Sequence, residues 1–125
     1  ENPPYFPKDE LTDKSMRFFV SEIIREKILK FYQKEIPYAC EVVVDSYKEE
    51  NNIDKISVLI FVERESQKAI VIGNGGSMLK RVGSEARKDI EEFTGKKSFI
   101  EIRVKVVKDW RNDEKSLKRF GYENR

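Results

Sequence analysis

Hydrophobic residues recur along this chain with two different periods. The first period, of three to four residues, is found in one long N-terminal segment. Apolar residues recur there every three or four positions and form a single stripe, which predicts an amphipathic helix from about residue 13 to residue 35. Thr12 and Asp13 are suitable N-cap residues, and Pro37 prevents the helix from continuing. The stripe is the face that we expect to meet the core: Met16, Phe19, Val20, Ile23, Ile24, Ile28 and Phe31.

Three other segments alternate between apolar and polar residues or are continuously apolar, and these we predict to be strands. They cover residues 39–47, 56–63 and 98–107. The segment 56–63 is apolar on both faces, which predicts a central strand. The charged run between the first two strands, residues 48–52, is typical of a solvated hairpin loop.

Two more helices are expected between the second and third strands. The first runs from residue 67 to residue 72, with Ser66 as its cap, and the second begins near residue 76 and ends before Gly95. A short terminal helix capped by Asn112 or Asp113 follows the last strand. The fold class is therefore α+β, in the order α-β-β-α-α-β, with a three-stranded sheet covered by helices on one face and a short C-terminal helix.

A glycine-rich stretch, Gly73-Asn74-Gly75-Gly76, separates the last two core helices. Glycine reaches positive φ without steric penalty, and a glycine turn that opens a helix presents free N–H groups suited to a phosphate. The window 68–88 contains five Lys or Arg residues and one acid, Glu85. A plain helix C-cap would need only one glycine, so three glycines with flanking cations favour a backbone-binding loop.

Two familiar nucleotide motifs do not fit this stretch. The only Gly-Lys pair, Gly95-Lys96, has Ile90 in place of the first Walker A glycine. The dinucleotide fingerprint fails because Met78 occupies its third glycine position. The remaining match is a Gly-x-x-Gly between two helices, the loop with which KH modules clamp single-stranded nucleic acid.

The loop and its surroundings supply the candidate binding residues. The loop N–H groups and the following helix N-terminus would hold phosphates, cations would add charge, and aliphatic side chains could floor a groove for about four unstacked bases. Two residues have open alternatives: Arg64 could instead pair with Glu63 or Glu65, and Trp110 could anchor the terminal helix. The candidates are Arg64, Lys68, Ile70, Ile72, Gly73, Asn74, Gly75, Gly76, Ser77, Met78, Leu79, Lys80, Arg81, Trp110 and Arg111.

Composition narrows the class of protein further. At 125 residues with a net charge of +2, the chain is long enough for one domain, and its C-terminal half carries the positive charge. There is no histidine, and the lone Cys40 excludes an internal disulfide and a cysteine-rich zinc site. We expect no metal, no cofactor and no enzymatic activity in this chain. No signal peptide or membrane span is apparent, so a cytoplasmic protein is expected.

The chain resembles a type II KH domain, and several motifs resemble those of the Era family of GTPases. They begin with the helix 18–28 and the Glu35-Ile36-Pro37-Tyr38 segment. They continue through Val62–Lys68, Ile72–Gly76, Ala86–Asp89 and Val106–Asp113, so they cover most of the chain. The Pro-Tyr-Phe-Pro entry at residues 4–7 resembles the link between the GTPase and KH domains of that family.

The resemblance implies a ribosome-assembly function. Residues 1–10 would be a linker from an absent upstream GTPase domain, and residues 11–125 the KH domain. The implied partners are the 3′ end of 16S ribosomal RNA and the small ribosomal subunit, with a peripheral contact at the inner membrane as a further option. Asn74 stands where the family commonly has Lys, which removes one phosphate-pairing cation. The alternative is a basic protein- or membrane-interaction module without specific RNA recognition.

Overall fold

The computed structural model describes residues 13–108. The first helix, α1 (Asp13–Phe31), is followed by a short α2 (Ile36–Ala39) and by two strands, β1 (Glu41–Glu49) and β2 (Ile53–Val62). Then come α3 (Glu65–Ile72), a 3₁₀ turn at Asn74–Gly76, α4 (Ser77–Thr94) and β3 (Lys97–Val106). The predicted N-terminal linker (1–10) and C-terminal helix lie outside the described residues.

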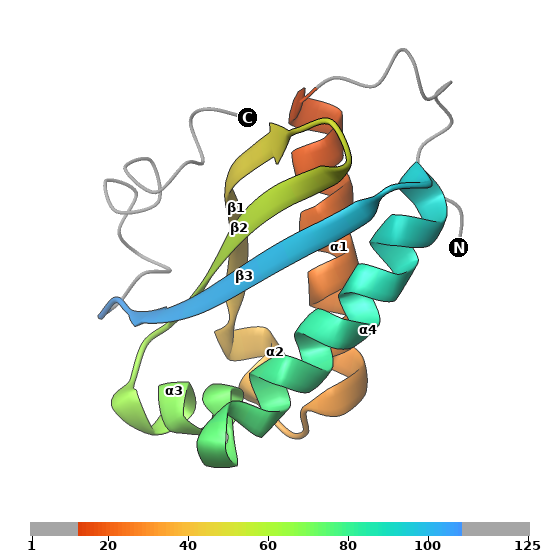
Figure 1. Cartoon of the computed structure of the whole chain (residues 1–125). Helices are drawn as coiled ribbons and strands as arrows, with labels where there is room; N and C mark the ends of the chain where they lie inside the picture. The colour runs from red at the N-terminus through yellow and green to blue at the C-terminus, as the bar shows by residue number, and fades with distance from the viewer. Residues whose placement is uncertain (1–12, 109–125) are drawn as a thin grey trace.

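The three strands form one mixed sheet in the order β1-β2-β3. β1 and β2 pair antiparallel, with Val43 opposite Leu59, and β2 and β3 pair parallel, with Val58 opposite Ile102. The long helices α1 and α4 lie side by side against one face of this sheet (Figure 1). The α+β fold class and the central position of the second strand are therefore confirmed.

The boundaries of several elements differ from the prediction. α1 ends at Phe31, not near residue 35, and the backbone of Lys34 then adopts a φ of 60°. Pro37 lies in the first turn of a short helix, α2, because the first turn of a helix has no intrahelical use for the N–H that proline lacks. Ser66 is not the cap of α3: the Gln67 side-chain oxygen accepts the N–H groups of Glu63 and Arg64, each at 3.0 Å.

The hydrophobic core lies between the helices and the sheet. Val20 and Ile24 of α1, Val58 of β2 and Val82 of α4 are all fully buried within it. A second, smaller cluster on the outer face of the sheet contains Val43, Leu59 and Phe61, with Val107 packed against it. β2 therefore buries both faces, as its continuous apolar run indicates. No helix within residues 13–108 is long and apolar enough to cross a membrane.

Candidate nucleic-acid interface

The glycine loop joins α3 to α4 through backbone angles that favour glycine. The φ angles of Gly73, Gly75 and Gly76 are 80°, 59° and 80°. Gly73 ends α3 by donating its N–H to Ala69 O at 2.9 Å, and Gly76 donates to Gly73 O at 3.1 Å. α4 begins directly after these four residues, with Gly76 as its N-cap. The interpretation of this stretch as a specialised loop agrees with all three positive φ angles.

The three glycines do not serve the same purpose. A Cβ atom on Gly73 would lie 2.6 Å from Cγ and 2.8 Å from the backbone N of Met78, which excludes any side chain at this position. A Cβ atom on Gly75 or Gly76 would meet nothing within 4 Å. Gly73 therefore closes the loop against the start of α4, while Gly75 and Gly76 leave the outer surface of the loop open to a ligand.

The outer surface of the loop presents hydrogen-bond donors. Asn74 and Gly75 are exposed, and within residues 13–108 no acceptor binds their backbone N–H groups. The N-terminal turn of α4 follows directly and contributes the positive end of its helix dipole. Free amides beside a helix N-terminus suit a phosphate group.

One buried hydrogen bond fixes the helix that leads into the loop. The Tyr32 hydroxyl, just after α1, donates to Val71 O at 2.5 Å, two residues before Gly73. Burial, with a smaller contribution from Cys40, raises the pKa of Tyr32 to about 12, so the donor proton is retained at neutral pH. α3 is thus held to the end of α1, and the loop projects from a fixed base.

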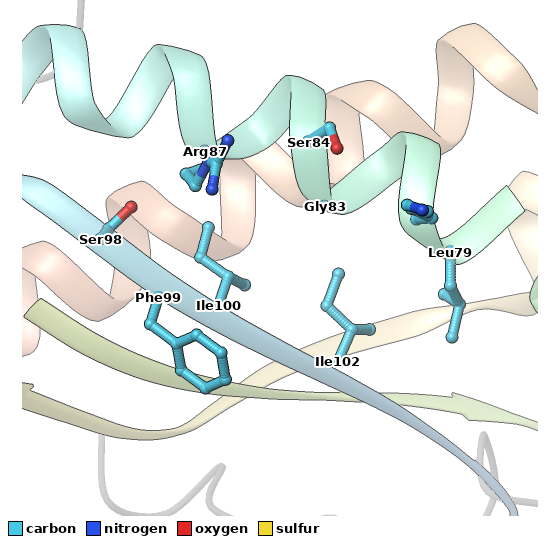
Figure 2. Close-up of a pocket in the computed structure, with 9 residues that line it drawn as sticks. Leu79, Gly83, Ser84, Arg87, Ser98, Phe99, Ile100 and Ile102 are labelled. Atoms are coloured by element: carbon cyan, nitrogen blue, oxygen red, sulfur yellow. The ribbon is translucent and has the colours of Figure 1, made fainter. Parts of the chain in front are cut away.

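A groove runs from the start of α4 along the inner face of β3 (Figure 2). Its cavity volume is about 320 Å³. The floor consists of Ile100 and Ile102 of β3, and the wall is the face of α4 that contains Gly83. The remaining lining residues are Leu79, Lys80, Ser84, Arg87, Ser98 and Phe99. A groove with an apolar floor and cationic edges fits unstacked bases with an attached phosphate backbone.

The structure places the predicted aliphatic residues in three environments. Leu79 lines the groove, Ile72 and Met78 pack partly buried against the core, and Ile70 is 52% exposed on α3. Ile70 and Ile72 are not among the groove-lining residues. The floor comes from β3 instead, because only the folded sheet brings that strand beside α4.

The predicted cationic residues also lie in different environments. Lys80 lines the groove, whereas the Arg81 guanidinium lies 4.0 Å from the centre of the Phe31 ring on α1. Arg64 is exposed at the N-cap of α3, and none of the ion pairs within residues 13–108 involves it or Lys68. Arg64 therefore does not pair with Glu63 or Glu65 in this structure, and it is not among the groove-lining residues either, so its contact with RNA stays a prediction.

Several groove residues were not among the sequence candidates: Gly83, Ser84, Arg87, Ser98, Phe99, Ile100 and Ile102. Gly83 did give a signal, because a glycine inside a helix is unfavourable unless close approach requires it.

Trp110 and Arg111 lie outside the described residues. Cys40 is buried, and burial raises its pKa to about 11, which agrees with a packed thiol.

The sequence of this chain matches a known domain family and known proteins. The KH domain family model matches residues 35–111. The chain is 52% identical over 124 residues to GTPase Era of Syntrophus aciditrophicus and 48% identical to GTPase Era of Geotalea daltonii. Each match covers 98% of this chain, which spans 40% and 42% of those two proteins.

Solved structures agree with these sequences. A crystal structure of Era in complex with MgGDPNP and nucleotides 1506–1542 of 16S ribosomal RNA matches with a TM-score of 0.80 and 37% identity. A structure of Aquifex aeolicus Era bound to GDP.AlF4- matches with a TM-score of 0.79. Each match covers 98% of this chain and about two fifths of the Era chain. The chain belongs to the KH domain family, and it corresponds to the KH portion of Era GTPases.

Proposed function

We propose that this chain binds single-stranded RNA in the groove between α4 and β3, with the phosphate backbone held at the glycine loop. The observation that carries the proposal is the position of Gly73-Asn74-Gly75-Gly76, which has exposed backbone amides at Asn74 and Gly75 and ends three residues before the groove-lining Leu79. A phosphate held by the loop leaves the attached bases beside Leu79, Ile102 and Ile100. Lys80 and Arg87 border this path and oppose the charge of the backbone.

The proposed RNA is the 3′ end of small-subunit ribosomal RNA, bound during ribosome assembly. Support comes from the solved Era complex, which contains nucleotides 1506–1542 of 16S ribosomal RNA and matches 98% of this chain. The chain would act as the RNA-binding part of a longer GTPase, because it spans about two fifths of its Era relatives. It would itself need no cofactor.

The decisive test replaces Asn74 and Gly75 together by Asp. Two carboxylates at the loop should repel a phosphate by about 1 kcal/mol each in water and by more at a partly desolvated surface. We expect RNA affinity to fall a hundredfold or more, measured by filter binding with RNA of nucleotides 1506–1542 of 16S ribosomal RNA. Both positions tolerate a side chain sterically, because a Cβ on Gly75 meets nothing within 4 Å and Asn74 is exposed.

A matched control places the same charges elsewhere. Asn51 and Asn52 are exposed in the β1–β2 turn, at the opposite end of the sheet from the glycine loop (Figure 1). The double replacement Asn51→Asp with Asn52→Asp should change affinity less than threefold, as a long-range effect only. The melting temperatures of both variants, compared with that of the parent, show whether each variant is folded. A folded loop variant that binds RNA as tightly as the parent would contradict the proposal.

The alternative function, a basic module for protein or membrane surfaces, makes a different prediction. Its binding would depend on charge alone, so a scrambled RNA of the same length should compete as well as the ribosomal sequence. The groove favours sequence discrimination, because bases that lie on its apolar floor can be distinguished, whereas Lys80 and Arg87 at its edges act on the backbone alone.

A further inference from the structure

We infer that the chain has a second RNA-contacting surface on the side of α4 that faces α1, where it binds the phosphate backbone of nucleotides flanking those in the groove. We call this surface the α1 corner and define it by Lys30, Phe31, Lys34 and Arg81. It rests on the proposed RNA-binding function and extends it beyond the groove.

The first observation is that Lys80 and Arg81 serve different sides of α4. Lys80 lines the groove, while Arg81 turns to α1 and lies over the face of Phe31. Successive helix residues point about 100° apart around the axis, so two neighbouring cations face different sides of α4 by geometry alone. Both belong to the first turns of α4, directly after the glycine loop. An RNA strand that enters or leaves the groove at the loop therefore passes Arg81.

The second observation is an uncompensated pair of charges on one aromatic ring. Arg81 Cζ lies 4.0 Å and Lys30 Nζ 5.8 Å from the centre of the Phe31 ring. None of the ion pairs within residues 13–108 includes Lys30 or Arg81. The acids four residues from them in sequence, Glu26 and Glu85, lie 3.8 Å from Lys27 and 3.4 Å from Lys88. Two like charges gathered without a counter-ion attract an anion. The Phe31 ring is partly buried against the core and positions Arg81 over its face.

The third observation concerns Lys34, in the turn three residues after Phe31. It is exposed and is the one non-glycine residue with a positive φ, 60°, within residues 13–108. This conformation costs about 1 kcal/mol for a residue with a long side chain, and Gly or Asn would adopt it more readily. A lysine at this position adds a third cation at the end of α1, where α4 also begins (Figure 1).

The three cations fit a phosphate backbone better than a base edge. The three cationic side chains are exposed, and they come from two separate helices and a turn. Cations spread over separate elements can contact successive phosphates of an RNA strand without reading its base sequence. The neighbouring Glu35 is the exposed acid of this turn, so the corner keeps a net charge of +2. We therefore assign flanking RNA backbone as the ligand.

The test compares RNA of two lengths. The long probe is nucleotides 1506–1542 of 16S ribosomal RNA, and the short probe is the tightest-binding oligomer of about four nucleotides from a tiling set of that sequence. The variant is Lys30→Gln with Lys34→Gln, which removes two charges and leaves the packed Arg81 in place. We expect roughly five- to tenfold weaker binding of the long probe, a shallower salt dependence, and unchanged binding of the short probe.

The matched control is Lys14→Gln with Lys48→Gln, which makes the same change in net charge. Lys14 is exposed on the first turn of α1, about 24 Å along the helix from Lys30, and Lys48 is exposed on β1. This variant should bind both probes like the parent. Arg81→Gln, checked by thermal melting, should weaken the long probe in the same selective way.

The outcomes separate the inference from the proposed function. Equal losses for both probes, no loss, or the same loss in the control would overturn the α1 corner. If the corner variants lose binding to anionic phosphatidylglycerol vesicles but not to RNA, the surface serves a membrane and the inference is wrong. If the Asn74→Asp with Gly75→Asp variant loses RNA while the corner variants do not, the groove function stands alone. If the parent binds neither probe, the proposed function fails.

Discussion

Lys27 Nζ lies 2.6 Å from Asp89 Oδ2, and this ion pair joins the C-terminal half of α1 to the C-terminal half of α4. The Lys27 side chain is 8% exposed, so its charge is held largely out of water. Burial on its own lowers the pKa of Lys27, but the hydrogen bond and charge of Asp89 outweigh burial, so the pKa is raised. The pair fixes the helix that forms the groove wall against the helix that bears the α1 corner.

Asp89→Asn should therefore lower the free energy of unfolding by about 2 kcal/mol, because it leaves a buried ammonium without its main partner. Lys27→Met, which removes the buried charge itself, should cost less. The exposed pair Lys88–Glu85 is the control: Lys88→Gln should change stability by less than about 0.5 kcal/mol. Urea denaturation at neutral pH measures all three. A larger loss for Lys27→Met than for Asp89→Asn would contradict this account.

Gly73 and Gly75 should respond differently to alanine. Gly73→Ala places a Cβ 2.6 to 2.9 Å from three atoms of Met78 at a φ of 80°, so we expect a loss of at least about 2 kcal/mol and weaker RNA binding. Gly75→Ala meets no atom within 4 Å and should cost about 1 kcal/mol from backbone conformation alone. Denaturation and filter binding distinguish the two; equal losses would show that steric closure at Met78 is unimportant.

Gly83→Ala should separate stability from binding. Its Cβ would lie 3.7 Å from Ile102 Cδ1, an ordinary contact, so the helix gains up to about 1 kcal/mol from the better helix former. The same methyl group occupies the groove, and we expect a modest loss of RNA affinity. Gly83→Leu should abolish most binding while the protein remains folded. Tight RNA binding by a folded Gly83→Leu variant would show that bases do not lie along α4.

Asn74→Lys should increase RNA affinity. Asn74 is exposed on the loop surface, and its φ is unremarkable because only Lys34 and glycines have positive values among the described residues. An added ammonium beside a bound phosphate should strengthen binding about fivefold and steepen the salt dependence by roughly 0.7 in the logarithmic slope. Filter binding over a salt series measures both. An unchanged slope would place the phosphate away from position 74.

The buried thiol of Cys40 should make the stability of the fold depend on pH in alkaline solution. Burial raises its pKa from 9.0 to about 11, so the folded state holds the thiol proton more tightly than the unfolded state. The resulting stability is fully present below pH 9 and is lost as the pH rises toward 11. Cys40→Ala should flatten this part of the stability curve. In the parent, the thiol should react with Ellman's reagent at pH 8 far more slowly in the folded than in the unfolded protein.

The periodicity of the chain determined its long helices, its three strands and their order, but not the short α2. The stripe from Met16 to Phe31, the alternation around Val42 and Ile102, and the two-sided run of β2 each reflect burial against a neighbour, so the pattern predicts α+β with β2 central. The glycine loop was likewise readable, because three closely spaced glycines are needed only where the backbone takes positive φ. Local chemistry of this kind is present in the sequence itself.

Only the tertiary structure decided which residues form the groove and which way its cations point. Ile100 and Ile102 follow the loop by more than twenty residues, and they reach α4 because parallel pairing with β2 carries β3 back beside it. Lys80 and Arg81 are neighbours in sequence, yet the packing of α4 against α1 sends Arg81 to Phe31 and leaves Lys80 in the groove. Contacts between distant segments depend on how helices pack on the sheet, and no local pattern contains that information.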